Sequence, residues 1–241
     1  MTTWLWAQPD PERARDTLFR VVGASAQRPG RGPVLPAPDE RVGWPERRPV
    51  QPGGTAEEER AARARGARAF TLWRDPEGRE ALAHVVTLAA SRRDGAEYEV
   101  RGAPGETLGV IRREPGSLWR LRRARWSVRQ LDRGAAPATA RKGLLRSWFL
   151  WLPSRPFQLL LTAFTMGEYA GAEPPRRLRF REPAEKGAGR SGRVVLDFRG
   201  GREDLQVVAG GWDRRVTAAL LLLLHSWESP LGRSGGHRSF V

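Results

Sequence analysis

A run of five leucines near the C-terminus constrains the fold of this chain more than any other feature. Leu220 to Leu224 lie within an apolar segment, Val216 to Trp227, and Asp213 is placed to cap a helix over that segment. Five successive apolar residues fill more than one helical turn, so the predicted helix has no polar face. A helix that is apolar all round has to be buried all round. We therefore expect other elements of the chain to surround it.

A membrane does not provide this burial, because both apolar stretches of the chain fail as bilayer spans. Val216 to Trp227 is only twelve residues long, whereas a spanning helix needs about 20. The second stretch, Trp148 to Phe164, is interrupted by Pro153, Arg155 and Pro156. No transmembrane span is expected. Aromatic residues beside an arginine do suit an interfacial segment, so the membrane-contact candidates are Trp148, Phe149, Trp151, Arg155 and Phe157.

Short runs with a period of two residues predict the strands that would surround the helix. Tyr98 and Val100 alternate with charged residues, a Gly-Ala-Pro-Gly turn follows at 102–105, and an extended pattern resumes at 107–111. This order predicts a hairpin. Further strands are predicted at 125–129, 177–181, 194–198 and 205–208. The predicted fold class is mainly β (α+β): a closed antiparallel barrel of about twelve strands around the buried C-terminal helix.

The first part of the chain has a different character. Ala24 to Gly54 is dense in Pro, Gly and Arg and offers few apolar residues to bury, which is typical of a disordered arm. Short helices are predicted on either side of it, one from Asp10 to Gly23 and one from Thr55, which has capping-box spacing with Glu58. The predicted organisation is a largely disordered Pro/Gly/Arg-rich arm with short helices (1–69), a barrel domain (70–231) and a flexible tail (232–241).

The composition limits the classes of function. The 241 residues contain 42 Lys and Arg against 27 Asp and Glu, a formal charge of +15, which favours nucleic acid, anionic lipid or acidic proteins as partners. Lysine occurs only at Lys142 and Lys186, and such an arginine bias can reflect genome composition rather than a ligand. The absence of cysteine excludes disulfides, thiolate catalysis and Cys-ligated metals. The N-terminus lacks a secretory signal, so a cytoplasmic location is expected, with peripheral contact at the inner membrane face as an extension of it.

The order of these segments resembles the tubby C-terminal-like superfamily, which includes phospholipid scramblases, LURP-one-related proteins and uncharacterised bacterial members. The resemblance covers about Phe70 to Leu231. It rests on the hairpin Tyr98-Glu-Val-Arg to Leu108-Gly-Val-Ile-Arg-Arg-Glu, on Arg125-Trp-Ser-Val, on Gly192-Arg-Val-Val-Leu-Asp-Phe and on Gly211-Trp-Asp-Arg-Arg-Val-Thr-Ala-Ala-Leu. It implies a closed barrel of about twelve strands around a central C-terminal helix. The paired basic motif of tubby proteins cannot be placed here, and the calcium-binding segment and palmitoylated cysteines of scramblases are absent.

No motif in the chain predicts an enzyme or a cofactor site. Gly187 to Gly192 has the glycine spacing of a dinucleotide fingerprint, but it precedes a predicted strand instead of a helix, so we interpret it as a flexible hairpin loop. His84, His225 and His237 are isolated from one another, without the short spacing that metal binding requires. The sequence predicts no catalytic residues, metal or cofactor.

The segment from Trp119 to Trp126 is the candidate site for an anionic ligand. Its four arginines lie between two indoles. Such arginines can pair with phosphates while the rings stack on bases or lie at a lipid interface. The alternative is a barrel strand with inward tryptophans and a solvated arginine face, and this alternative is favoured. The arginines concerned are Arg120, Arg122, Arg123 and Arg125.

Three functions remain open at this level. The leading hypothesis is a non-enzymatic scramblase-like or tubby-like module that associates peripherally with anionic membrane lipids. The second is a nucleic-acid-binding protein that uses the Arg/Trp cluster. The third is a scaffold or interaction protein whose Pro-rich arm binds a protein partner.

Overall fold

The computed structural model describes residues 3–9, 19–25, 41–75, 77–116, 123–141, 177–183, 192–200 and 204–228. Within these ranges the fold is mainly β, with twelve strands and two helices. The strands are β1 (Thr3–Pro9), β2 (Phe19–Ser25), β3 (Arg41–Arg47), β4 (Phe70–Trp73), β5 (Ala81–Ser91), β6 (Gly95–Gly102), β7 (Thr107–Glu114), β8 (Arg125–Gln130), β9 (Ala138–Arg141), β10 (Arg177–Arg181), β11 (Val194–Arg199) and β12 (Asp204–Val207). The helices are α1 (Ala56–Arg65) and α4 (Arg214–Glu228).

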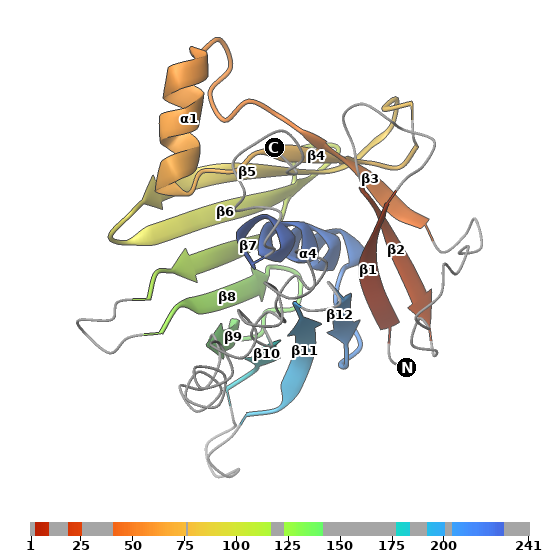
Figure 1. Ribbon diagram of the computed structural model, residues 1–241. Coiled ribbons are helices and arrows are strands. Elements are labelled where there is room, and N and C mark those ends of the chain that lie inside the picture. The colour runs from red at the N-terminus through yellow and green to blue at the C-terminus, as the bar shows by residue number, and fades with distance from the viewer. Residues whose placement is uncertain are drawn as a thin grey trace, which may run out of the picture.

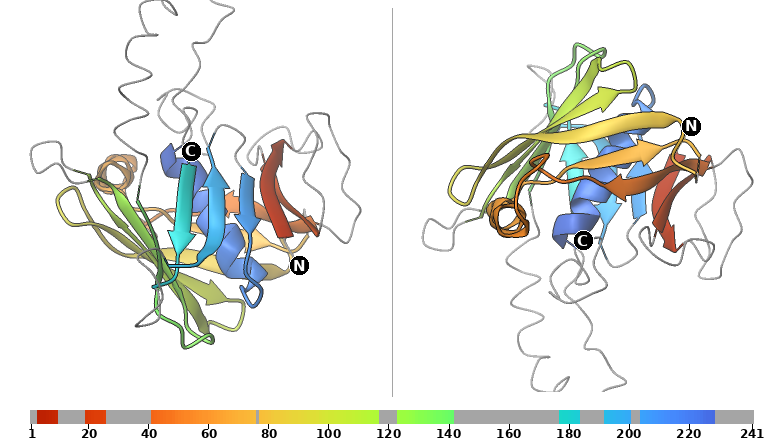
Figure 2. Two further views of the ribbon diagram at one scale, coloured as in Figure 1. Left: turned by 90° about the horizontal axis from the view of Figure 1, so that it is seen from below. Right: turned by 90° about the horizontal axis from the view of Figure 1, so that it is seen from above.

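Ten strands, β3 to β12, form one continuous antiparallel sheet in which each strand pairs with its neighbour in sequence. This sheet curves around α4 but is not closed on itself (Figures 1 and 2). The β1–β2 hairpin lies between its two edges. β1 pairs with β12 from Thr3↔Val207 to Trp6↔Asp204, whereas β2 pairs with β3 only at Val21↔Gly43 and Val22↔Arg41. The order of paired strands is therefore circular only when the N-terminal hairpin is included.

The prediction that residues 70–231 form a closed barrel is wrong. The described parts of residues 70–231 supply nine strands, β4 to β12, and these nine strands alone leave the sheet open. The missing three strands come from the segment predicted to be a disordered arm. Residues 19–25 are strand β2, whereas a helix was predicted to end near Gly23. Local composition misled the prediction, because these strands are stabilised by pairing with other strands: β1 with β12, β2 with β1 and β3, and β3 with β4.

Helix α4 lies at the centre of the molecule, as the leucine run predicts. Every residue from Val216 to His225 is buried, at 2% exposure or less. Asp213 caps the helix, since its carboxylate accepts a hydrogen bond from the backbone N–H of Arg215 at 2.7 Å. The inward side chains of the sheet pack on α4, and the largest of them are Tyr98, Ile111, Trp126, Phe180 and Phe198. The predicted hairpin at 98–111 and the four further strands are confirmed as β6–β7, β8, β10, β11 and β12.

Helix α1 lies outside the sheet, beside β5 and β6 (Figure 1). Its N-terminus has the predicted capping box between Thr55 and Glu58. It ends at Gly66, whose φ of 109° is in the left-handed region that favours glycine. A Cβ at Gly66 would lie 2.9 Å from the indole of Trp227, the penultimate residue of α4. Gly66 therefore allows α1 to end directly against the C-terminal turn of the central helix.

Tyr98 joins these elements through its hydroxyl group. The hydroxyl donates to the carbonyl of Gly66 at 2.6 Å and accepts from the indole Nε1 of Trp227 at 2.9 Å. The ring is completely buried, and burial raises the pKa of Tyr98 to about 12. Because the unfolded chain ionises first, near pH 10, stability is unaffected below pH 10 and falls as the pH rises from 10 to about 12.

We expect Tyr98→Phe to remove this pH dependence. The variant leaves the Gly66 carbonyl and the Trp227 indole without their shared partner, which costs roughly 1–3 kcal/mol at pH 7. Between pH 10 and about 12 the difference in unfolding free energy between wild type and variant should narrow, because only the wild type loses stability through this group. Urea unfolding at each pH measures both quantities. A difference that stays constant across this window would contradict the assignment.

Candidate functional site

The outer surface of β8, β9 and β10 is strongly basic. Strand pairing places Arg125 directly opposite Arg141, and Arg181 opposite Thr139, so these residues share one side of the sheet. The outward positions of the three strands hold six arginines, Ser127 and Thr139, and no carboxylate. We call these six arginines the basic face: Arg125, Arg129, Arg141, Arg177, Arg179 and Arg181.

The two-residue period of the strands creates the basic face. In Arg177-Leu-Arg-Phe-Arg181 the arginines are exposed or half-buried, while Leu178 and Phe180 are buried against the core. In β8, Trp126 and Val128 are fully buried between Arg125, Ser127 and Arg129. Because alternate side chains in a strand point to opposite faces, the burial of the apolar set fixes the arginines on the outside.

The basic face ends at a carboxylate on the neighbouring strand β11. Asp197 accepts hydrogen bonds from Arg177, whose Nε lies 2.9 Å from Oδ1, and this interaction raises the pKa of Arg177. Arg179 and Arg199 approach the same carboxylate, each at 3.9 Å. The side chains of Arg177 and Arg179 remain nearly half exposed, at 45% and 47%. One carboxylate is shared by three guanidinium groups, so it neutralises this border only in part.

The outer surface of β5 and β6, in contrast, is not strongly basic. The outward positions of β5 and β6 include His84, Glu97, Glu99 and Arg101, and the guanidinium of Arg101 is paired with the carboxylate of Glu99. Within the described strands, the outward positions of β8 to β10 are therefore more basic than those of β5 and β6.

The candidate residues for an anionic ligand are only partly described. Arg125 lies on the basic face, and Arg123 is half-buried just before β8, whereas Arg120 and Arg122 lie outside the described residues. Trp126 is completely buried, so the favoured interpretation of an inward tryptophan is confirmed for this indole. The other five arginines of the basic face were not predicted as a site. The alternation of arginine with apolar residues at 177–181 is a sequence signal that could have identified three of them.

The membrane-contact candidates Trp148, Phe149, Trp151, Arg155 and Phe157 lie outside the described residues. Their segment is nevertheless attached to the basic face by the covalent chain. It leaves the sheet after Arg141, the last residue of β9, and returns at Arg177, the first residue of β10. Both attachment points belong to the basic face.

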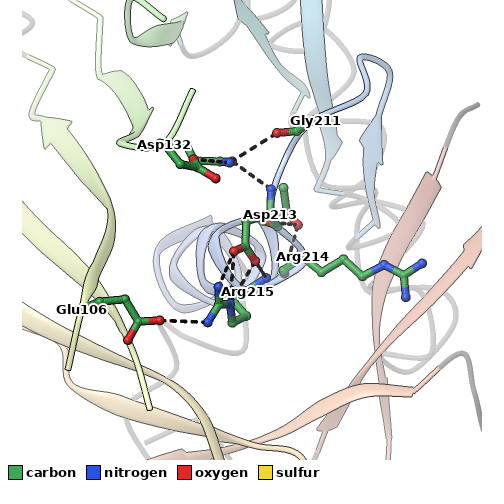
Figure 3. Close-up of polar contacts among 8 residues, drawn as sticks. Glu106, Asp132, Gly211, Asp213, Arg214 and Arg215 are labelled. Atoms are coloured by element: carbon green, nitrogen blue, oxygen red, sulfur yellow. Dashed lines mark hydrogen bonds and ion pairs between the residues drawn. The ribbon is translucent and has the colours of Figure 1, made fainter. Parts of the chain in front are cut away.

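A second polar site lies where α4 begins (Figure 3). The guanidinium of Arg215 binds the carboxylates of Asp213 and Glu106, at 2.8 and 3.1 Å, which raises the pKa of Arg215. The side-chain amide of Gln130 accepts from the backbone N–H of Asp213 and donates to Asp132 and to the carbonyl of Gly211. These contacts fix the start of α4 to β8 and to the β6–β7 turn.

An open pocket of about 550 Å³ adjoins this network, lined by Leu82, Pro104, Glu106 and Arg214 among others. Arg74 and Glu80 on its wall form an ion pair of 3.0 Å. Figure 3 shows Arg214 extending from the helix away from Glu106. Most charges of the pocket are thus paired within the protein, and we assign this region a structural role.

The described histidines do not form a catalytic or metal site. The Nδ1 of His84 lies 3.0 Å from the hydroxyl of Thr71, but Thr71 is only 2% exposed and cannot reach a substrate. Burial, Arg48 and Arg101 lower the pKa of His84. His225 is buried in α4, and His237 lies outside the described residues. In the described ranges, no three His, Asp or Glu side chains are grouped to hold a metal ion.

Neither α1 nor α4 has the length and apolar character needed to cross a bilayer as a helix. The kinship with tubby-like proteins stays a prediction. No protein-family model matches the chain, and comparison with curated proteins and with solved structures finds no significant match.

Proposed function

We propose that this protein is a non-enzymatic binding module that associates peripherally with anionic membrane surfaces through the basic face. The observation that supports the proposal most directly is the set of six outward arginines on three adjacent strands that carry no carboxylate of their own, with Asp197 of β11 neutralising one border only in part. In this proposal the contact is made from the cytoplasm at the inner face of the membrane.

Electrostatic energies support a surface of this kind. A basic residue held near an anionic bilayer contributes about 1 kcal/mol, and the attraction decays within a Debye length of about 8–10 Å. Arginines spread over the whole molecule cannot all approach a membrane at once, whereas those on one arc can. The sequence also predicts membrane contacts for the aromatic residues between Arg141 and Arg177.

We expect a triple variant, Arg125→Gln, Arg141→Gln and Arg179→Gln, to bind anionic vesicles roughly 100-fold more weakly, from about 1 kcal/mol lost at each site. Binding is measured by co-sedimentation with vesicles of phosphatidylcholine and phosphatidylserine at low salt. All three side chains are outward, so folding should be preserved, and circular dichroism checks this.

The matched control changes three exposed arginines elsewhere: Arg65, Arg79 and Arg92 to Gln. This control lowers the net charge by the same amount as the triple variant. If the basic face is responsible for binding, the control should weaken vesicle binding far less, because its three arginines lie outside that face. Equal losses in both variants, or equal binding of the wild type to neutral and anionic vesicles, would contradict the proposal.

The burial of Trp126 argues against a nucleic-acid site in which this indole stacks on a base. An indole that is completely buried cannot stack on a base. A salt-dependent affinity for single-stranded oligonucleotides that exceeds the affinity for vesicles would nevertheless favour nucleic acid as the ligand of the basic face. The scaffold hypothesis concerns a Pro-rich segment mostly outside the described residues, and it stays a prediction.

A further inference from the structure

Two arginines, Arg68 and Arg113, contact Trp227 where α4 stops, and Arg47 lies close enough to Arg68 to be affected by its charge. We call Arg47, Arg68 and Arg113 the end cluster. The guanidinium carbons of Arg68 and Arg113 lie 4.7 and 3.7 Å from the centroid of the Trp227 indole. Arg47, at the end of β3, pairs with the inward-facing Phe70, so its side chain is on the inner side of the sheet. All three arginines are half-buried and remain open to solvent in part.

The arginines of the end cluster are partly removed from water. Burial lowers the pKa of both Arg47 and Arg68, and the charge of Arg68 further lowers the pKa of Arg47. The Nε of Arg47 is shielded from water and has no hydrogen-bond acceptor within the described residues. The guanidinium of Arg47 is therefore not fully hydrogen-bonded within the described residues.

The negative groups described near Arg47 and Arg68 do not balance these two cations. The carboxylate of Glu59 attracts Arg47, but Arg63 is its ion-pair partner, and its second oxygen accepts from the backbone N–H of Val50 at 2.8 Å. Tyr98 stays neutral below its pKa of about 12. The C-terminal end of α4 carries only about half a negative charge. The dipole of α4 and the shared carboxylate of Glu59 together therefore do not fully neutralise the positive charges of Arg47 and Arg68.

We propose that the end cluster is a binding site for a small doubly charged oxyanion such as inorganic phosphate. A guanidinium group presents several N–H donors in a planar fork that matches the oxygens of such an anion. Trp227 keeps two of these groups in position through cation–π contacts. The site is separate from the basic face, which lies on the outer surface of β8 to β10.

Thermal unfolding of the full chain in phosphate tests the proposal, with chloride at the same ionic strength as the reference. The expected result is a Tm that rises by a few degrees with phosphate and saturates, because the anion binds only the folded state. Arg47→Gln should abolish the rise. Arg214→Gln, which removes an exposed arginine at the other end of α4, should retain it.

Equal Tm shifts in wild type and Arg47→Gln, or equal shifts with phosphate and chloride, would overturn the proposal. If Arg47→Gln does not fold, Arg47→Lys keeps the charge without the planar fork, and isothermal titration calorimetry should show weaker phosphate binding. Vesicle co-sedimentation separates a free anion from a lipid headgroup. A site for the free anion leaves vesicle binding of Arg47→Gln unchanged, so this proposal and the membrane proposal can fail independently.

Discussion

Leu221→Asp is expected to abolish cooperative folding. Leu221 is completely buried in the middle of α4, where it is surrounded by the sheet. The substitution removes a large apolar side chain, at a cost of about 2–5 kcal/mol, and buries a carboxylate without a partner, which adds several kcal/mol more. The total is comparable with the whole stability of a typical domain, about 5–15 kcal/mol. Circular dichroism and thermal melting should show a chain without a sharp transition.

Leu131→Asp is the matched control, because Leu131 is 43% exposed in the turn after β8. The same chemical change there should alter stability by about 0.5 kcal/mol or less. A cooperative melt of Leu221→Asp near the wild-type Tm would show that α4 is not the buried centre of the fold.

The second large effect is expected from removing residues 1–25, which contain β1 and β2. The remaining ten-strand sheet would have two unpaired edges, at β3 and β12. It would also lose Leu5, which is 1% exposed and belongs to the core around α4. Exposed edges and an uncovered apolar helix favour aggregation. We expect the truncated chain to bind the dye ANS and to lose its cooperative thermal transition.

A point variant in the N-terminal hairpin should have a smaller effect than removing the hairpin. Leu5→Ala keeps both strands but opens a cavity against α4, so it should lower the unfolding free energy by about 2–5 kcal/mol in urea titrations. If the truncated chain melts as cooperatively as the full chain, the N-terminal hairpin is dispensable and the fold depends on β3 to β12 alone.

The two proposed sites depend on the central helix in different ways. The basic face exists because the inward side chains of β8 to β10 are held against α4, which leaves their arginines outside. The end cluster exists because Trp227 lies in the last turn of α4, beside the end of α1 and the Tyr98 hydroxyl. Both therefore require an intact core, and the variants chosen to test them avoid it.

The sequence by itself determined the local elements that carry their own pattern. The five leucines predicted a buried helix, Asp213 its cap, Thr55 and Glu58 a capping box, and the alternation around Tyr98 and Trp126 two inner strand faces. These features depend on residues a few positions apart, so a linear sequence displays them directly.

Only the tertiary structure decided what closes around the helix and where the charges gather. Strands β1 to β3 lie in or beside a segment whose composition is typical of disorder, and they form because β1 pairs with β12, β3 pairs with β4, and β2 pairs with both β1 and β3. The basic face joins Arg125 to Arg141 and β10 across segments far apart in the chain. Cross-strand register sets both features, and register is fixed by long-range packing of the inward side chains, which no local pattern contains.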